Sequence, residues 1–97
     1  ESDWASDQVP PGFRMVSTQQ KTLPDTEDPV THIIYSDGLV TVSVFIAPDA
    51  GKKKAGRSSV GASNSYSTVV DEYRVTAVGQ VPQITVEQIA KSMRHSQ

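Results

Sequence analysis

Hydrophobic and polar residues alternate along much of this chain with a period of two, which is the spacing of side chains on one face of a β-strand. The clearest alternation covers residues 30–36 and 39–46, and Asp37-Gly38 lies between the two runs. Asp-Gly between β-branched runs favours a two-residue type I′ turn, because both turn residues need a positive φ. The sequence therefore predicts a β-hairpin in which Ser36 lies opposite Leu39.

The predicted register assigns the side chains of this hairpin to two faces. One face collects Thr31, Ile33, Tyr35, Val40, Val42, Val44 and Ile46. The other face holds His32, Ile34, Thr41, Ser43 and Phe45. We expect the first face to contact the core, and the second, more polar face to be partly exposed or covered by a helix or another domain.

Three further segments complete the predicted sheet. A strand is expected over residues 13–19, with Phe13, Met15 and Ser17 on one face, and residues 20–29 form a surface loop by composition. A long Gly/Ser/Lys connection extends from about residue 51 to residue 65. Residues 66–70 and 73–80 are then predicted to form a second hairpin around Asp71-Glu72.

The pattern changes to helical spacing near the end of the chain. Thr85 is a suitable N-cap with Gln88 three residues later, and Ile84 could pack on Ile89 as a hydrophobic staple. The apolar residues that follow share one helix face: Val86, Ile89, Ala90 and Met93. The predicted fold class is α+β: a small, mostly antiparallel β-sheet with a C-terminal α-helix packed on one face.

Composition supports strands and a single domain. The 97 residues contain 13 Val and 5 Ile but only 2 Leu, and β-branched side chains fit a pleated surface better than a helix. The length suits one domain over residues 1–97, and no apolar run reaches the roughly 20 residues of a membrane span. The chain begins at Glu1 without a methionine, so we expect a mature or excised piece.

Charge is divided unevenly along the chain. Residues 1–49 contain eight acidic and two basic side chains, whereas residues 50–97 contain three acidic and seven basic ones. Lys52, Lys53, Lys54 and Arg57 are the candidate contacts to an anion, such as a lipid phosphate, or to an acidic partner. The alternative is a solvated loop. An overall acidic chain without aromatics in this stretch argues against nucleic-acid binding.

Few residues suggest catalysis or metal binding. His32 lies opposite Ser43 in the predicted register, which would allow a base and a nucleophile, but no acid is placed to orient the imidazole. His95 is expected at a frayed helix end, and the absence of cysteine removes thiolate zinc sites. The acidic residues 25–28 lack the ligand pattern of a calcium loop. We therefore predict no catalytic residue, no metal and no cofactor; Trp4 is expected to close the edge of the core.

An ordered set of motifs carries a resemblance to a known family. The motifs are Trp4; Val9-Pro10-Pro11-Gly12-Phe13; Pro29-Val30-Thr31-His32; Tyr35-Ser36-Asp37-Gly38-Leu39; Val42-Ser43-Val44-Phe45-Ile46; Val75 to Pro82; and Thr85 with Ile89-Ala90. In this order they resemble the C-terminal domain of the MucB/RseB family of periplasmic negative regulators of the envelope-stress sigma factor. Val9 and Gln80 are mild departures, and residues 52–65 match no motif of the family.

The resemblance implies a non-enzymatic regulatory module in the periplasm. Such proteins bind the periplasmic segment of an anti-sigma factor of the RseA or MucA type and protect it from the site-1 protease. A larger N-terminal domain, similar to lipoprotein carriers, normally precedes this module and is a further expected partner; it is absent from this sequence. The alternative function is sensing of lipopolysaccharide by the basic stretch. Self-association through an exposed strand edge is a further expectation.

Overall fold

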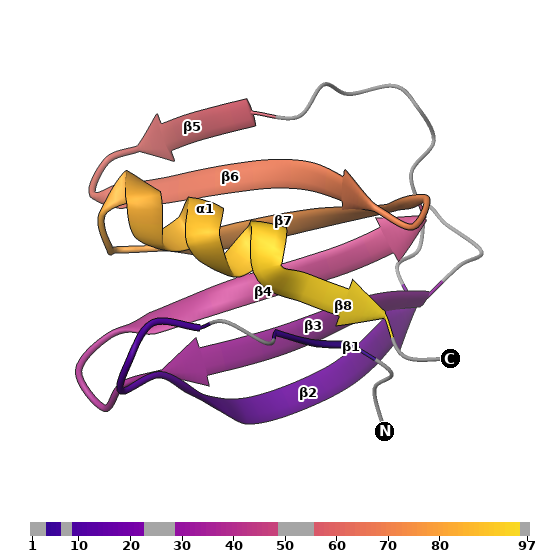
Figure 1. The fold of residues 1–97 in the computed structure, drawn as a ribbon, viewed down its shortest axis with the longest axis horizontal. Helices are drawn as coiled ribbons and strands as arrows, with labels where there is room; N and C mark the ends of the chain where they lie inside the picture. Colours follow the sequence, from indigo (N-terminus) through magenta and orange to yellow (C-terminus); the bar gives the residue numbers. More distant parts are fainter. Residues whose placement is uncertain (1–3, 7–8, 23–28, 49–55, 96–97) are drawn as a thin grey trace.

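A six-stranded antiparallel sheet forms most of the molecule, and one helix packs on one of its faces (Figure 1). The computed structural model describes residues 4–6, 9–22, 29–48 and 56–95. The order of strands across the sheet is β2-β3-β4-β7-β6-β5. Their bounds are β2 Arg14–Thr22, β3 Pro29–Ser36, β4 Thr41–Pro48, β5 Gly56–Val60, β6 Ser63–Val70 and β7 Tyr73–Gly79. This arrangement confirms the predicted α+β class.

The core lies between the sheet and helix α1 (Gln83–Ser92). The strands β3, β4 and β7 alternate buried and more exposed side chains, as period-two sequences require. Fully or almost fully buried side chains on the helix-covered face of these strands are Thr31, Ile33, Tyr35, Val42, Val44, Ile46, Val75 and Ala77. The two predicted faces of the first hairpin are therefore correct, except that Val40 is only partly buried.

The register of the β3–β4 hairpin differs from the prediction by two residues. Ser36 pairs with Thr41, not with Leu39. The connection is a longer loop, in which the Asp37 carboxylate accepts hydrogen bonds from the backbone N–H groups of Leu39 (2.9 Å) and Val40 (3.0 Å). These donors, Val40 first, hold the pKa of Asp37 below its usual range. A shift of two residues leaves every side chain on its predicted face, because the period of a strand is also two.

The second hairpin has the turn that was expected of the first. Asp71 and Glu72 both have positive φ (51° and 70°), which is the type I′ conformation, and they join β6 to β7. The long connection predicted from about residue 51 to Ser65 is wrong over its described part: residues 56–60 form β5 and pair with β6 through a turn at Gly61 (φ 61°). Residues 51–55 lie outside the described residues. The sequence of β5 has little apolar alternation. It forms a strand at the sheet edge because its backbone pairs with that of β6.

The first sheet strand is longer than predicted and is bulged. Met15 pairs with Tyr35 and Ser17 with Ile34, so Val16 has no partner across the strand. A bulge inserts one extra residue into one strand, so the side chains after the bulge lie on the opposite face from the one that simple alternation predicts. The predicted common face of Phe13, Met15 and Ser17 is therefore wrong. The strand also continues to residue 22, into the segment 20–29 that was predicted as a loop, and residues 23–28 of that segment lie outside the described residues.

The helix begins before the predicted cap. Pro82 is the N-cap residue and makes no side-chain cap, while Thr85 donates its backbone N–H to the Pro82 carbonyl oxygen at 2.9 Å. Ile84 is 65% exposed, so the predicted staple is absent. The start of the helix is held by the sheet instead: the Gln83 side-chain amide donates to the Ser65 carbonyl oxygen at 2.7 Å. The predicted buried face of Val86, Ile89 and Ala90 is confirmed.

Two short strands at opposite ends of the sequence form a second, two-stranded sheet. Strand β1 (Trp4–Ser6) pairs antiparallel with β8 (Met93–His95), so Trp4 lies opposite His95. Figure 1 shows this ribbon beside the C-terminal end of the helix. Residue 95 was expected at a frayed helix end and instead belongs to a strand. Trp4 is 5% exposed and belongs to the core, as predicted.

Candidate binding surface

The helix covers one face of the six-stranded sheet (Figure 1), and we call the opposite face the open face. Register and alternation place on it Arg14, Ser17, Gln19, Lys21, His32, Ile34, Thr41, Ser43, Phe45, Ser65, Ser67, Val69, Arg74, Thr76 and Val78. Hydroxyl groups predominate, and Phe45 (39% exposed) and Val69 (44%) are its most exposed apolar side chains. Side chains of these types can exchange hydrogen bonds with a bound molecule and contact its apolar groups.

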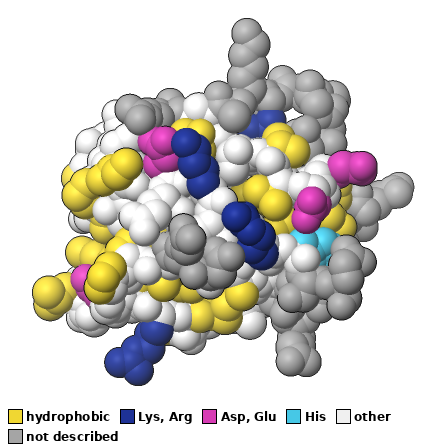
Figure 2. Space-filling model, viewed as in Figure 1, with side chains coloured by type: hydrophobic (Ala, Val, Ile, Leu, Met, Phe, Trp, Pro, Cys, Tyr) yellow, Lys and Arg dark blue, Asp and Glu magenta, His cyan; other side chains and the backbone are white. Residues whose placement is uncertain are grey.

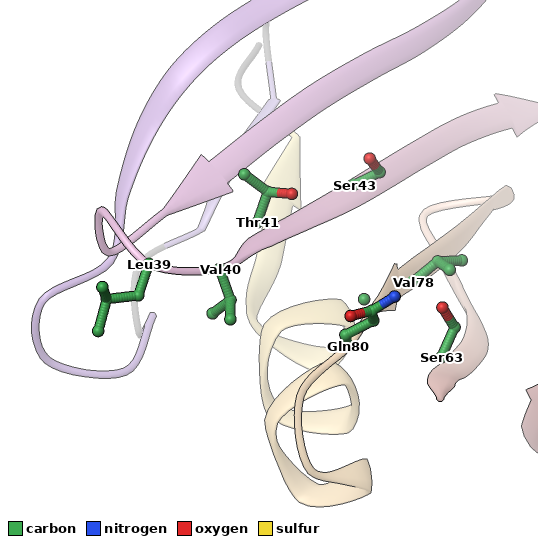
Figure 3. A pocket seen from close by; sticks show the side chains of 8 residues that line it. Leu39, Val40, Thr41, Ser43, Ser63, Val78 and Gln80 are labelled. Carbon is green, nitrogen blue, oxygen red and sulfur yellow. The ribbon is translucent and has the colours of Figure 1, made fainter. Parts of the chain in front are cut away.

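A cleft of about 470 Å³ lies where the open face ends, between the start of β4, the end of β7 and the start of β6 (Figure 3). Its lining residues are Leu39, Val40, Thr41, Ser43, Ser63, Val78, Gly79 and Gln80. Figure 3 shows Thr41 and Ser43 of β4 on one side, and Val78, Gln80 and Ser63 on the other. Leu39 is 91% exposed. The cleft is thus small, open and mixed in polarity, with one large apolar side chain in solvent beside it.

Gly79 is required where β7 passes β4 at this cleft. A Cβ atom on Gly79 would lie 2.8 Å from the Thr41 carbonyl oxygen, which is backbone and cannot easily move. The chain then bends at Gln80 and Val81 before the helix. Close approach of two backbones, more than the bend, explains the glycine.

The predicted pairing of His32 with Ser43 is wrong. His32 lies opposite Phe45, and the two rings stack with their centroids 4.5 Å apart, while Ser43 lies opposite Ile34. The two-residue shift of the hairpin register causes this difference. Strand pairing therefore gives no support to a His32–Ser43 base and nucleophile.

Protonation of His32 should cost stability. Its Nε2 atom is buried without a hydrogen-bond partner, and burial, followed by the charge of Lys21, holds the pKa of His32 below its ordinary value of 6.5. The unfolded chain therefore binds this proton more readily than the folded chain. The stability contributed by neutral His32 is complete above the ordinary pKa and is lost as the pH falls through the lower, folded pKa. We expect urea midpoints to fall between neutral pH and about pH 5, and to fall less in His32→Gln. Equal losses in the two proteins would contradict this assignment.

His95 also has a structural role that its position in the sequence did not suggest. Its ring stacks on Trp4 with centroids 4.6 Å apart and an interplanar angle of 9°, and Tyr73 contacts both rings edge-on at 5.3–5.4 Å. Only pairing of the two ends of the chain brings these residues together, so no local motif could have revealed the cluster. It closes the edge of the core beside β1 and β8.

Comparison with known proteins identifies the family. A sequence model described as the MucB/RseB C-terminal domain matches residues 1–94. The chain belongs to the MucB/RseB family. It is 38% identical over 96 residues to the sigma factor AlgU regulatory protein MucB of Pseudomonas aeruginosa, and 32% identical over 93 residues to the sigma-E factor regulatory protein RseB of Salmonella typhimurium. These matches cover 94% and 95% of this chain.

Two solved structures of MucB are similar to this chain over 98% or more of its length. MucB in complex with the periplasmic part of MucA superposes with a TM-score of 0.88, at 36% identity, over 100% of this chain and 38% of that chain. A second structure, of the Pseudomonas aeruginosa MucA/MucB complex, gives a TM-score of 0.86 at 37% identity over 98% of this chain and 35% of that chain. The chain spans 30% of the MucB sequence and 29% of the RseB sequence that it matches.

Other functional expectations for this MucB/RseB family member fall partly outside the described residues. Lys52, Lys53 and Lys54 lie outside them, and Arg57 is described only as a backbone position of β5. The acidic residues 25–28 also lie outside. Among the described residues, no cluster of three or more His, Asp or Glu side chains could hold a metal ion. No helix in the described part of the chain is long and apolar enough to cross a membrane.

Proposed function

We propose that this chain is a non-enzymatic binding module of a periplasmic regulator, and that it contacts the periplasmic segment of an anti-sigma factor of the MucA or RseA type. The observation that carries the proposal is the similarity of the entire chain to MucB in complex with the periplasmic part of MucA. Curated relatives named as sigma factor regulatory proteins support the same conclusion. Binding would hold the segment away from the site-1 protease.

The module is proposed to act together with an N-terminal, lipoprotein-carrier-like domain. The support is that the relatives are about three times longer than the matched region, which is 30% of MucB. Binding by the isolated 97-residue chain should then be weaker than binding by a protein that contains both parts, since two linked contacts raise the effective concentration of each.

The test is titration of a fluorescently labelled MucA periplasmic segment with the 97-residue chain, followed by anisotropy. We expect saturable binding, and slower cleavage of the segment by the site-1 protease when the chain is present. A segment of identical composition in scrambled order is the matched control. Absence of binding at high micromolar concentration would overturn the assignment of anti-sigma binding to this module.

The lipid-sensing alternative depends on the charge of Lys52, Lys53, Lys54 and Arg57 alone. Its separate test is replacement of all four by Gln. Loss of lipopolysaccharide binding with retained binding of the MucA segment would support a lipid contact at this stretch. Unchanged lipopolysaccharide binding would contradict the lipid-sensing function.

A further inference from the structure

We propose that the cleft and the adjoining open face bind an extended, acidic segment of a partner polypeptide, with one aliphatic side chain of that segment in the cleft. The proposal rests on the proposed function, because it takes the anti-sigma periplasmic segment as the occupant. It adds which face of the module is used and which chemistry of the segment is recognised.

The size and lining of the cleft fit a side chain with its backbone. A volume of about 470 Å³ is ample for one aliphatic side chain and neighbouring main chain. Val40 and Val78 supply apolar lining, whereas the hydroxyls of Thr41 and Ser63 and the amide of Gln80 can donate to and accept from a peptide backbone. An extended segment presents such groups at every residue. Leu39, 91% exposed beside the cleft, would be covered by the bound segment.

Charge on the open face selects an acidic partner. Arg14 and Lys21, at opposite ends of β2, are both exposed, and Arg74 lies on the same face of β7. Among the described residues of the six strands, the open face carries no Asp or Glu side chain. Asp37, in the loop beside the cleft, is turned onto backbone N–H groups of its own loop. The exposed Asp71 and Glu72 lie in the β6–β7 turn, at the other end of β7 from the cleft, so Arg14 is the charged strand residue nearest the cleft among the described residues. A basic charge there favours an anionic residue in the partner and disfavours a cationic one.

The helix side of the molecule differs in this respect. Figure 2 shows basic and acidic side chains near one another on that side. There Lys91 forms an ion pair with Glu87 at 2.8 Å, one helical turn away. Mixed charges cancel over a few ångströms, so the helix side gives no comparable selection by charge.

Strand pairing also fixes a spacing within the bound segment. Arg14 pairs with Ser36, and Ser36 pairs with Thr41 at the cleft, so Arg14 lies two strands from the cleft. Two strand spacings are about 10 Å, and an extended chain advances about 3.3 Å per residue. Side chains on one side of an extended segment lie an even number of residues apart, so in a segment that crosses the strands an acidic residue two or four positions from the aliphatic anchor could contact the long Arg14 side chain.

Two exposed positions allow the proposal to be tested without disturbing the core. Thr41→Glu places a carboxylate at the cleft, and Arg14→Glu reverses the charge at the other end of the same row; both side chains are exposed. In titrations of the MucA periplasmic segment, we expect each variant to bind at least about tenfold more weakly than the unmodified chain, which corresponds to about 1.4 kcal/mol or more. Binding by the unmodified chain should weaken as salt is raised, and less steeply in Arg14→Glu.

Ile84→Glu is the matched control, because it adds the same carboxylate at an exposed position of the helix, away from the open face. We expect less than about a twofold change for it, and unchanged urea midpoints for all three variants. If Thr41→Glu and Arg14→Glu bind the segment as the unmodified chain does, this inference fails while the proposed function stands. If the unmodified chain binds no segment, both fail.

Anionic lipid is the competing source of negative charge, and vesicles of phosphatidylglycerol are the probe for it. We expect the vesicles not to displace the MucA segment. Displacement that is itself abolished by Thr41→Glu would assign the open face to a membrane surface and overturn the inference.

Discussion

Replacing Trp4 by alanine should lower the free energy of unfolding by about 3–5 kcal/mol, the usual cost of truncating a buried Trp. Trp4 is 5% exposed, stacks on His95 and contacts Tyr73 edge-on. Its removal leaves a cavity at the edge of the core and takes from β1 its only buried side chain. Because small domains are stable by only roughly 5–15 kcal/mol, the variant should be close to unfolding at room temperature.

Urea unfolding followed by circular dichroism measures this effect, since the fluorescence of the single Trp is lost in the variant. Trp4→Phe is the control, because it retains an aromatic ring that can stack on His95, and it should lose clearly less stability. A midpoint for Trp4→Ala equal to that of the unmodified chain would show that the β1–β8 ribbon contributes nothing to folding.

The second large effect is expected in the helix. Ile89→Ala should cost about 2–5 kcal/mol, because Ile89 is fully buried between α1 and the sheet. Ile84→Ala on the same helix should change stability by less than about 0.5 kcal/mol, since Ile84 is 65% exposed. Both changes remove the same atoms from the same element, so their difference isolates the cost of burial.

The same pair of variants tests where the helix begins. A hydrophobic staple between these two isoleucines, as the sequence pattern favours, would make Ile84→Ala clearly destabilising. Similar losses in both variants, measured by urea unfolding, would contradict the helix start at Gln83.

Period-two alternation predicted the faces of the sheet well, but not the register of its first hairpin. The faces of Ile33 and Val44 depend only on whether each position is odd or even, and a two-residue shift preserves that. The register instead depends on the loop, where the Asp37 carboxylate binds two backbone N–H groups and stabilises a longer connection. Competition of this kind between a side chain and a tight turn is not visible in a pattern of hydrophobic residues.

Segments with little apolar pattern of their own were not predictable. Strand β5 is polar and pairs with β6, and β1 pairs with β8 from the other end of the sequence. The helix was predicted from its buried stripe, but its start was not, because Gln83 is held by the Ser65 carbonyl oxygen of the sheet rather than by a cap. Local rules identify elements that carry their own apolar pattern and miss those that do not.

The candidate site shows the same division. That His32, Ile34 and Ser43 share one polar face followed from alternation, and the family followed from ordered motifs along the chain. The cleft could not be predicted from the sequence, because its lining comes from three separate strands. The charge of the open face could not be predicted either. Arg14 and Lys21 lie in the acidic half of the sequence and Arg74 lies in the basic half, so only sheet pairing places them on one surface.

Pairing of the first and last strands has a consequence for the order of folding. The β1–β8 contact joins Trp4 to His95, so it closes a loop that contains nearly the whole chain. The entropic cost of closing a flexible loop increases with its length. This cost is much smaller for the β6–β7 hairpin, which closes over a two-residue turn. We therefore expect the hairpins to form first and the ribbon last, so that amide hydrogens of β1 and β8 exchange with solvent faster than those of β4 and β7. The two ends of the domain then pair only after the six-stranded sheet has formed.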